Sequence, residues 1–203
     1  MNKFEEQGRV RFLDYDEETA LMAELSEPLR TMVLSGIHTG LRLKSEALKL
    51  TWGDLSLERG TVTVDAAYAK NKETRTVKLN STIRAALSQK KRGGCDDYVF
   101  GKPDGGHYTS IRTAFNNAVD RAKLEGVTVH VLRHTFASRL VMAGVDLPTV
   151  QKLGCWKTLD MVLRYAHLSP SHLDAAVEKI AKNSTTLSTT HTKEAPADVA
   201  INA

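Results

Sequence analysis

Apolar residues recur every three to four positions along most of the chain, which is the spacing of amphipathic helices. The pattern predicts a series of helices at residues 16–25, 28–38, 44–50, 81–91, 111–124, 131–143, 147–153, 159–165 and 169–181. Pro28 suits the first turn of the second helix, and Asn80 or Ser81 would cap the fourth. Gly144 and Gly154 follow two of the later helices, and glycine commonly ends a helix. The chain is therefore predicted to be mainly helical.

Strand-like alternation interrupts the helices only in the first half. Residues 61–66 and 74–79 alternate apolar and polar side chains and are rich in β-branched residues. The polar segment 69–73 between them predicts a hairpin turn, and Tyr98–Phe100 is predicted to add a third short strand after a pair of glycines. The expected fold class is α+β, mostly α-helical with a small antiparallel three-stranded sheet.

The end of the chain differs in composition from the rest. From about Asn183 it is rich in threonine, serine and alanine and has almost no large apolar residue, so residues 183–203 are expected to form a disordered tail. Residues 1–182 are enough for one well-filled core and are expected to form one domain.

Composition narrows the class of protein only a little. Charged residues make up 26% of the chain, which is ordinary for a globular protein, and no apolar run reaches the length of a membrane span. No signal-peptide pattern opens the chain, so a cytoplasmic protein without a membrane partner is expected. The net charge of +4 hints at a polyanionic partner, and Cys95 and Cys155 show no metal-ligand spacing.

Four short segments hold the candidate chemistry. Their candidate residues are Arg42 and Glu46, Lys70 and Lys72, His130 and Arg133, and Trp156 and Tyr165.

Each of these residues alone has an ordinary structural explanation. His130 and Arg133 are three apart, so they share a helix face on which they would most often be solvated. Arg42 could be a surface arginine. Glu46 could orient Arg42 or a histidine, or it could be a first-turn helix glutamate stabilised by the helix dipole. Loop lysines are common, and the two aromatic residues would usually be half-buried in a core.

Together, the set suits phosphoryl transfer. Two guanidinium groups can hold an anionic oxygen through paired hydrogen bonds, and a lysine can protonate a leaving oxygen. A phenol, whose ordinary pKa is about 10, becomes a nucleophile beside positive charge or a base. Positive groups stabilise a pentavalent transition state, and the sequence has no glycine-rich nucleotide loop, so neither a metal nor another cofactor is expected.

In order and spacing, these segments resemble the tyrosine recombinase, or phage integrase, family. The most specific segment is His130-Val131-Leu132-Arg133-His134-Thr135-Phe136-Ala137-Ser138, followed by Leu153-Gly154 and Arg164-Tyr165. The resemblance extends from about Val10 to Leu168 and implies the catalytic domain of that family.

The resemblance implies three residues that hold the scissile phosphate, and a fourth that could. Arg42 and Arg133 resemble the two arginines that grip it, and His130 resembles the histidine that hydrogen-bonds it and assists proton transfer. Trp156 stands where the family has histidine or tryptophan. Its indole N–H can bind a phosphate oxygen but cannot carry a proton.

The resemblance also implies the groups that make and break bonds. Tyr165 resembles the nucleophile that forms a 3′-phosphotyrosyl link, which keeps the bond energy, so rejoining needs no ATP. Lys70 resembles the hairpin lysine that protonates the leaving 5′ oxygen. Lys72 is a rival for that role if the loop is shifted by two residues.

The chain departs from the family pattern in two ways. Glu46 lies four residues after Arg42, whereas the family's acidic residue lies three after, so one residue is inserted and the role of Glu46 is less fixed. Nothing before Val10 could form the family's N-terminal DNA-binding domain. The chain is therefore expected to be a truncated piece with low DNA affinity of its own.

The implied function is site-specific recombination for integration or excision of a mobile element. The implied partners are double-stranded attachment sites, a homotetramer that exchanges its C-terminal helix, and accessory directionality and DNA-bending proteins at the nucleoid of a bacterial host. The 169–181 helix could equally pack on its own domain. Type IB topoisomerase-like relaxation and DNA binding without catalysis are the alternative functions. Further candidate phosphate contacts, which could also be ordinary surface charges, are Arg112, Lys123, Arg139 and Lys152.

Overall fold

The computed structural model describes residues 10–67, 73–170 and 177. The chain divides into a compact unit that ends at Pro170 and a second unit, residues 171–203, of which only Val177 is described. Lys70, Lys72 and the expected tail 183–203 therefore lie outside the described residues, as does most of the predicted helix 169–181.

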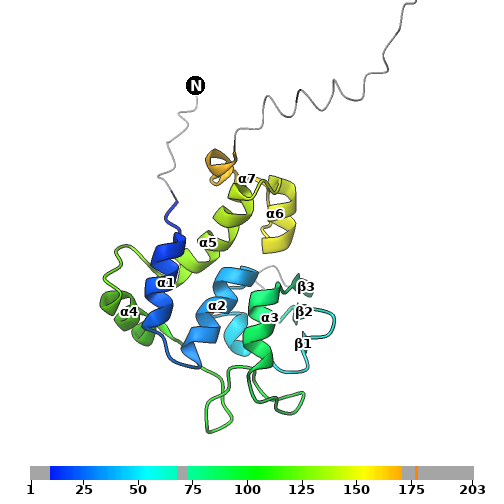
Figure 1. Ribbon diagram of the computed structural model, residues 1–203. Helices are drawn as coiled ribbons and strands as arrows, with labels where there is room; N and C mark the ends of the chain where they lie inside the picture. The colour runs from blue at the N-terminus through cyan, green and yellow to red at the C-terminus, as the bar shows by residue number, and fades with distance from the viewer. Residues whose placement is uncertain (1–9, 68–72, 171–176, 178–203) are drawn as a thin grey trace, which may run out of the picture. The chain divides into compact units, whose positions relative to one another are not determined.

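The compact unit is mainly helical, as predicted. Its helices are α1 (Tyr15–Ala23), α2 (Leu29–Thr39), α3 (Ser81–Ser88), α4 (Arg112–Arg121), α5 (Val129–Met142), α6 (Leu147–Gly154) and α7 (Asp160–Leu163), with two 3-10 helices, η1 (Ala47–Lys49) and η2 (Ala166–Leu168). Figure 1 shows α1 and α2 beside the long helix α5, with α6 and α7 at the far end of α5 and the small sheet next to α3.

The three-stranded antiparallel sheet is confirmed, but one of its strands was wrongly predicted. The strands are β1 (Leu55–Ser56), β2 (Thr61–Val64) and β3 (Arg75–Lys78), in the order β1-β2-β3. Tyr98–Phe100 is not the third strand, because Tyr98 forms only an isolated bridge with Thr51. Instead Gly60, at φ +60°, allows the tight turn that folds β1 back onto β2.

Side chains and glycines fix the ends of the helices. Asn80 caps α3 by accepting a hydrogen bond from the Ile83 N–H, which decides between the two predicted caps. Gly40, at φ +67°, ends α2 in the left-handed conformation. Gly154, expected to follow a helix, is instead the last residue of α6, and Cys155 takes the left-handed position at φ +52°.

The apolar core has two clusters, and α5 contributes to both. Val131 and Leu132 belong to the larger cluster, which extends over α1–α4 and the sheet. Ala137 and Val141 belong to a smaller cluster formed with α6, α7 and the residues around them. The helix therefore connects the body of the domain to the α6–α7 end.

Close packing of α2 on α5 positions the turn that follows α2. A Cβ at Gly36 would lie only 3.2 Å from the Cβ of Leu132, so a larger residue would push the two helices apart. Because the helices approach so closely, Gly40 and Arg42 reach the N-terminal half of α5.

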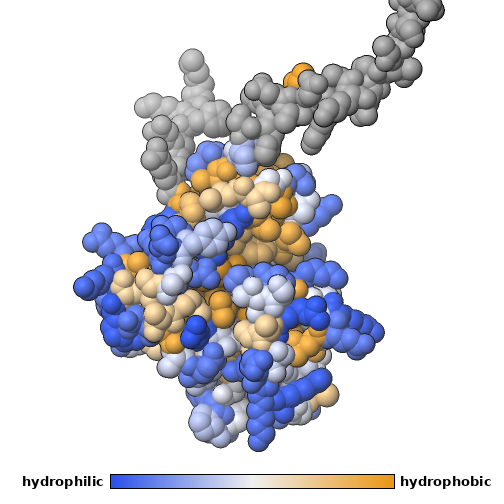
Figure 2. Space-filling model, viewed as in Figure 1, coloured by the Kyte–Doolittle hydropathy of each residue, from blue (hydrophilic) through white to orange (hydrophobic). Residues whose placement is uncertain are grey.

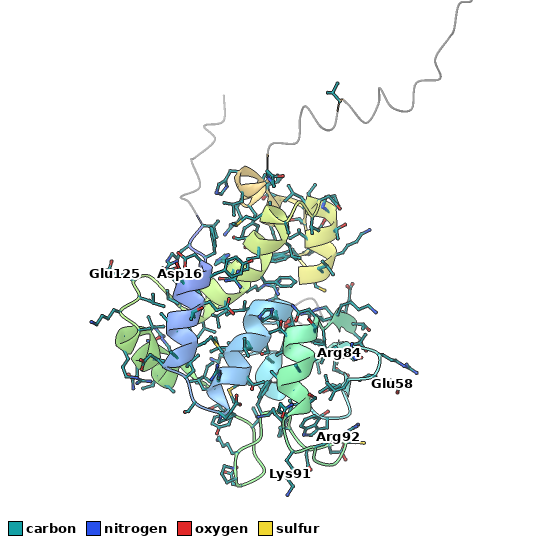
Figure 3. The ribbon with its side chains drawn as sticks, in the orientation of Figure 1. Asp16, Glu58, Arg84, Lys91, Arg92 and Glu125 are labelled. Atoms are coloured by element: carbon teal, nitrogen blue, oxygen red, sulfur yellow. The ribbon has the colours of Figure 1, made fainter. Side chains whose placement is uncertain are left out.

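The surface is charged around the body and apolar toward α7. In Figure 3 the charged side chains of Arg84, Lys91 and Arg92 project from α3 and the loop after it. Figure 2 shows apolar surface over the region of α6 and α7. The exposed large apolar residues there are Met142, Leu159, Met161 and Leu163. No described helix is long and apolar enough to cross a membrane.

Candidate active site

The first two turns of α5 place three titratable side chains close together. Thr128 precedes the helix in extended conformation, so His130 falls in the first turn and Arg133 and His134 in the second. His130 is exposed, whereas Arg133 is only 9% exposed. His130 and Arg133 therefore lie at the start of one helix, as predicted.

Arg133 is held by two backbone carbonyls and one aromatic ring. Its two terminal nitrogens donate hydrogen bonds to the carbonyl oxygens of Gly40 and Gly154. Its guanidinium carbon lies 4.2 Å from the ring centroid of Trp156, within range of a cation–π contact. Burial, followed by the nearby charge of Arg42, lowers the pKa of Arg133 to about 10, so the guanidinium stays protonated at neutral pH.

Glu46 binds Arg42 despite the inserted residue. Its Oε2 accepts the backbone N–H of Arg42 at 2.9 Å, and its Oε1 accepts Nη1 of Arg42 at 2.8 Å. The chain turns tightly here, with the Glu46 N–H donating to the Arg42 carbonyl. With four residues from Arg42 to Glu46, this turn brings the carboxylate back to Arg42, so the inserted residue does not prevent the contact.

Arg75 is a site residue that the sequence analysis missed. It lies on β3, and its Nη2 donates to Oε2 of Glu46 at 2.7 Å. Its Nε and Nη1 are buried and have no hydrogen-bond partner among the described residues. The signal was present in the alternation of β3, since Arg75 shares a face with buried Val77.

The carboxylate of Glu46 pairs with both guanidinium groups of this cluster. Burial alone would raise the pKa of Glu46, but hydrogen bonds from Arg75 and from the Arg42 backbone outweigh it and hold the pKa below its ordinary value. Glu46 is 1% exposed, and because its pKa is lowered it is ionised at neutral pH inside the domain. One buried carboxylate thus lies between two guanidinium groups, which leaves a net positive charge on the cluster.

Tyr165 lies in the smaller core cluster and is hydrogen-bonded to His134. The residue sits between α7 and η2, is 1% exposed, and packs its ring 6.1 Å from that of Trp156. Its hydroxyl oxygen is 2.7 Å from Nδ1 of His134. Burial raises the pKa of Tyr165, although Arg164 and Arg133 oppose the shift. His134 is a second residue that the sequence analysis did not select, although it follows Arg133 directly.

Gly154 makes room for Trp156. A Cβ on Gly154 would lie 1.7 Å from Cζ3 of the indole, a distance no side chain can adopt. The carbonyl of the same glycine binds Arg133. Gly154 therefore fixes both the ring and the guanidinium that stacks on it.

A groove of about 1120 Å³ adjoins this cluster. It runs between the segment after α2, the start of α4 and the start of α5, and Arg42, His130 and Arg133 all line it. Its lining also contains Lys44, Lys49 and Arg112, with Asp120 as the acidic member. Tyr165 does not line this groove.

Of the further candidate phosphate contacts, Arg112 and Arg139 have different surroundings. Arg112, at the start of α4, faces the groove. Arg139 instead pairs with Glu18 and stacks over Tyr15 at 4.3 Å, so its charge joins α5 to α1. Arg139 is therefore a structural contact in this conformation, and the expectation of a phosphate contact is not supported.

Fold and site together define a mainly helical domain in which arginines, histidines and a tyrosine gather around the start of α5. Comparisons with known proteins show the family to which this domain belongs. The sequence profile of the phage integrase family matches residues 11–172. The integrase of Salmonella phage P22 is 35% identical over 185 residues, which cover 85% of this chain and 47% of that protein. The tyrosine recombinase XerC of Oceanobacillus iheyensis is 34% identical over 157 residues, covering 70% of this chain and 49% of the relative.

The solved structures agree with the sequence comparisons. The catalytic domain of bacteriophage HP1 integrase superposes with a TM-score of 0.65 at 32% identity, over 83% of this chain and 94% of that domain. The chain belongs to the phage integrase family. It spans about half the length of the curated relatives it matches.

Proposed function

We propose that this chain is the catalytic domain of a site-specific DNA recombinase that cuts and rejoins strands through a 3′-phosphotyrosyl link. The observation that supports this most directly is the position of Arg133. It lines the positively charged groove and stacks on Trp156, which in turn packs against Tyr165. One guanidinium therefore connects the surface open to DNA with the phenol.

In the proposed reaction, the scissile phosphate lies over Arg42, His130 and Arg133. The two guanidinium groups stabilise the negative charge that grows on the phosphate oxygens, and His130, which is exposed, hydrogen-bonds one of them. Trp156 supports Arg133 by stacking, and its indole N–H is a further donor to the phosphate. Glu46 orients Arg42 through both its backbone and its side chain.

Tyr165 attacks the phosphorus and takes over the 3′ phosphate, and the 5′ oxygen leaves. We assign protonation of that oxygen to Lys70, with Lys72 as the alternative. Because the phosphotyrosyl link has the energy of the bond it replaces, the reverse attack by a 5′ hydroxyl reseals the strand without ATP or a metal.

The substrate we propose is double-stranded DNA at attachment sites. The groove brings five cationic side chains to one surface against one carboxylate, the arrangement expected for phosphate contacts. Among the structural relatives, XerH was solved bound to its palindromic difH substrate, with a TM-score of 0.67 at 22% identity over 89% of this chain and 56% of that one. That likeness shows that this chain has the same fold as a protein whose structure was solved on DNA.

We further propose that residues 1–182 form the catalytic domain, with 183–203 as a tail, and that copies assemble as a tetramer on DNA by exchanging the C-terminal helix. The apolar side chains exposed around α7, among them Met161 and Leu163, suit such a contact. Accessory directionality and DNA-bending proteins, and a place at the nucleoid in the bacterial cytoplasm, belong to the same proposal.

Two other functions compete with recombination. A type IB topoisomerase would use the same groups to relax DNA without exchanging partners, and would act on plasmid without a specific site. A DNA-binding protein without catalysis would not need a phenol beside a buried arginine and an imidazole.

The test is formation of a covalent protein–DNA adduct. The chain is incubated at low salt with supercoiled plasmid and with nicked duplexes, then denatured, with Tyr165→Phe in parallel. We expect an adduct that maps to Tyr165 and is missing in the variant. DNA binding without any adduct, in this chain and in a longer one that includes an N-terminal clamp, would contradict the enzymatic function.

A further inference from the structure

His134 is the one residue in contact with the hydroxyl of Tyr165 that the proposed mechanism leaves unused. Its Nδ1 is 2.7 Å from the phenolic oxygen, and the two ring centroids are 6.0 Å apart. His134 lies in the second turn of α5, and Tyr165 lies in the turn from α7 to η2. The contact therefore joins α5 to the segment that follows α7.

The direction of the hydrogen bond decides whether His134 can accept the phenolic proton. Tyr165 is 1% exposed, so its hydroxyl proton cannot go to bulk water. Among the described residues no other acceptor lies within hydrogen-bond distance of that hydroxyl. With the phenol as donor, the bond runs from Oη–H to Nδ1 of His134 and the imidazole has its own proton on Nε2. This is the tautomer that the inference requires.

The groups around His134 keep its ring neutral. Those facing it are His130 and Arg133 on the same helix, and Arg164 and Tyr165 on the segment packed against it. Burial, helped by the positive charge of Arg164 and its neighbours, lowers the pKa of His134. A neutral imidazole whose Nδ1 is unprotonated is able to accept a proton at pH 7.

We propose that His134 is the general base that takes the phenolic proton of Tyr165 during strand cleavage, a role that rests on the recombinase function proposed above. The Oη–H bond breaks and its proton moves to Nδ1, while an Oη electron pair forms the bond to phosphorus. The bond from phosphorus to the 5′ oxygen breaks, and that oxygen receives its proton from the general acid assigned to Lys70. On rejoining, His134 returns the proton as Oη leaves.

The position of His134 fits this role. Arg133, the adjacent residue, lines the groove where the phosphate is proposed to bind, so the base and the phosphate ligand are one residue apart on one helix. The nearby cations raise the acidity of the phenol, which opposes the effect of its burial. Without a base, attack would depend on the small fraction of Tyr165 that is ionised.

The discriminating substitution is His134→Asn. The asparagine Oδ1 falls near the position of Nδ1 and can accept the hydrogen bond, but it cannot take a proton at neutral pH. A structural role for His134 would therefore be preserved and a role as base would be lost. The matched control is His38→Asn, since His38 is also half-buried and uses Nδ1 in a hydrogen bond with Asn80 at 3.0 Å, away from the phenol.

The measurement is the single-turnover rate of adduct formation on a nicked duplex from pH 7 to 9. We expect a nearly flat profile for the wild type and for His38→Asn. His134→Asn should be slower by about 10²-fold at pH 7 and should recover about tenfold per pH unit as the phenol ionises. A His134→Asn rate that matches the wild type, or that is reduced equally at every pH, would overturn the role as base and leave the recombinase function intact. No wild-type adduct on any duplex would overturn both.

A second measurement needs no DNA. Nitrogen NMR of the free chain should show the His134 ring neutral and protonated on Nε2, and the Nδ1 signal should shift in Tyr165→Phe. A proton found on Nδ1 instead would overturn the inference directly, because that nitrogen could not then accept the phenolic proton.

Discussion

The guanidinium of Arg133 lies 4.2 Å above the indole of Trp156, and the carbonyl of Gly154 binds the same guanidinium. The two contacts come from one short segment at the end of α6, so that segment sets the orientation of the arginine. A planar guanidinium can stack and donate two hydrogen bonds at once, whereas an ammonium cannot.

Arg133→Lys is therefore expected to abolish most activity while keeping the charge. We expect adduct formation to fall by at least about 10²-fold, the usual effect of losing a donor to a developing oxyanion. The melting temperature should also fall, because two buried carbonyls lose a partner. Arg121→Lys, an exposed arginine paired with Glu24, is the control and should change neither quantity.

Gly154→Ala should displace Trp156. Its Cβ would overlap the indole, so we expect a loss of about 1–3 kcal/mol in the free energy of unfolding, measured by urea denaturation. In a Trp156→Ala background the same substitution should cost much less, since the ring it would strike is gone. Additive effects of the two changes would show that the contact is not the cause.

Glu46→Gln should destabilise the domain in a way that depends on pH. The pKa of Glu46 is lowered in the folded state, so its ionised form contributes stability above its unfolded pKa of about 4.3, and this contribution is lost as pH falls through the folded pKa. At pH 7 the variant leaves two arginines without their carboxylate and should lose about 3–5 kcal/mol.

The comparison for this variant is the dependence of stability on pH. Wild type should lose stability as pH falls below about 4.3, the unfolded pKa, and Glu46→Gln should lose less, so that the two curves converge in acid. Parallel curves over this range would show that folding does not lower the pKa of Glu46.

Arg112→Gln should weaken DNA binding through a lost phosphate contact. The affinity should fall for all sequences alike, and the slope of log affinity against log salt should shrink by about 0.9. Arg84→Gln, which removes an exposed arginine of α3 outside the groove, is the control (Figure 3). Equal salt slopes for wild type and Arg112→Gln would place the DNA elsewhere.

The sequence was sufficient where local patterns decide the structure. The helical spacing and the β-branched hairpin strands are set by residues close in the chain, and both were found. The cap of α3 was narrowed to Asn80 or Ser81, and the structure shows Asn80. The strand predicted at Tyr98–Phe100 was wrong because β-branched and aromatic residues also occur in buried segments that are not strands. Which segment Tyr98 pairs with depends on the tertiary structure, and it pairs only with Thr51.

The site shows the same division. Arg42, His130, Arg133 and Tyr165 were predicted because their types, order and spacing resemble those of a known family. The structure brings the first three to one groove, whereas Tyr165 lies outside its lining. Arg75 and His134 were missed because their roles depend on which distant side chain they meet, a carboxylate 29 residues away for one and a phenol 31 residues away for the other. Burial of a charged residue on the inner face of a strand was the available clue for Arg75.

Tyr165 is enclosed in the smaller apolar cluster, with its hydroxyl turned toward an imidazole. An enzyme that breaks DNA is a hazard to the genome that houses it whenever its nucleophile is open to collision. Burial of the phenol removes that hazard. A duplex that collides with the free chain contacts arginines and a histidine but no attacking oxygen. Under the proposed function, protection against stray cleavage is thus a property of the free chain's fold.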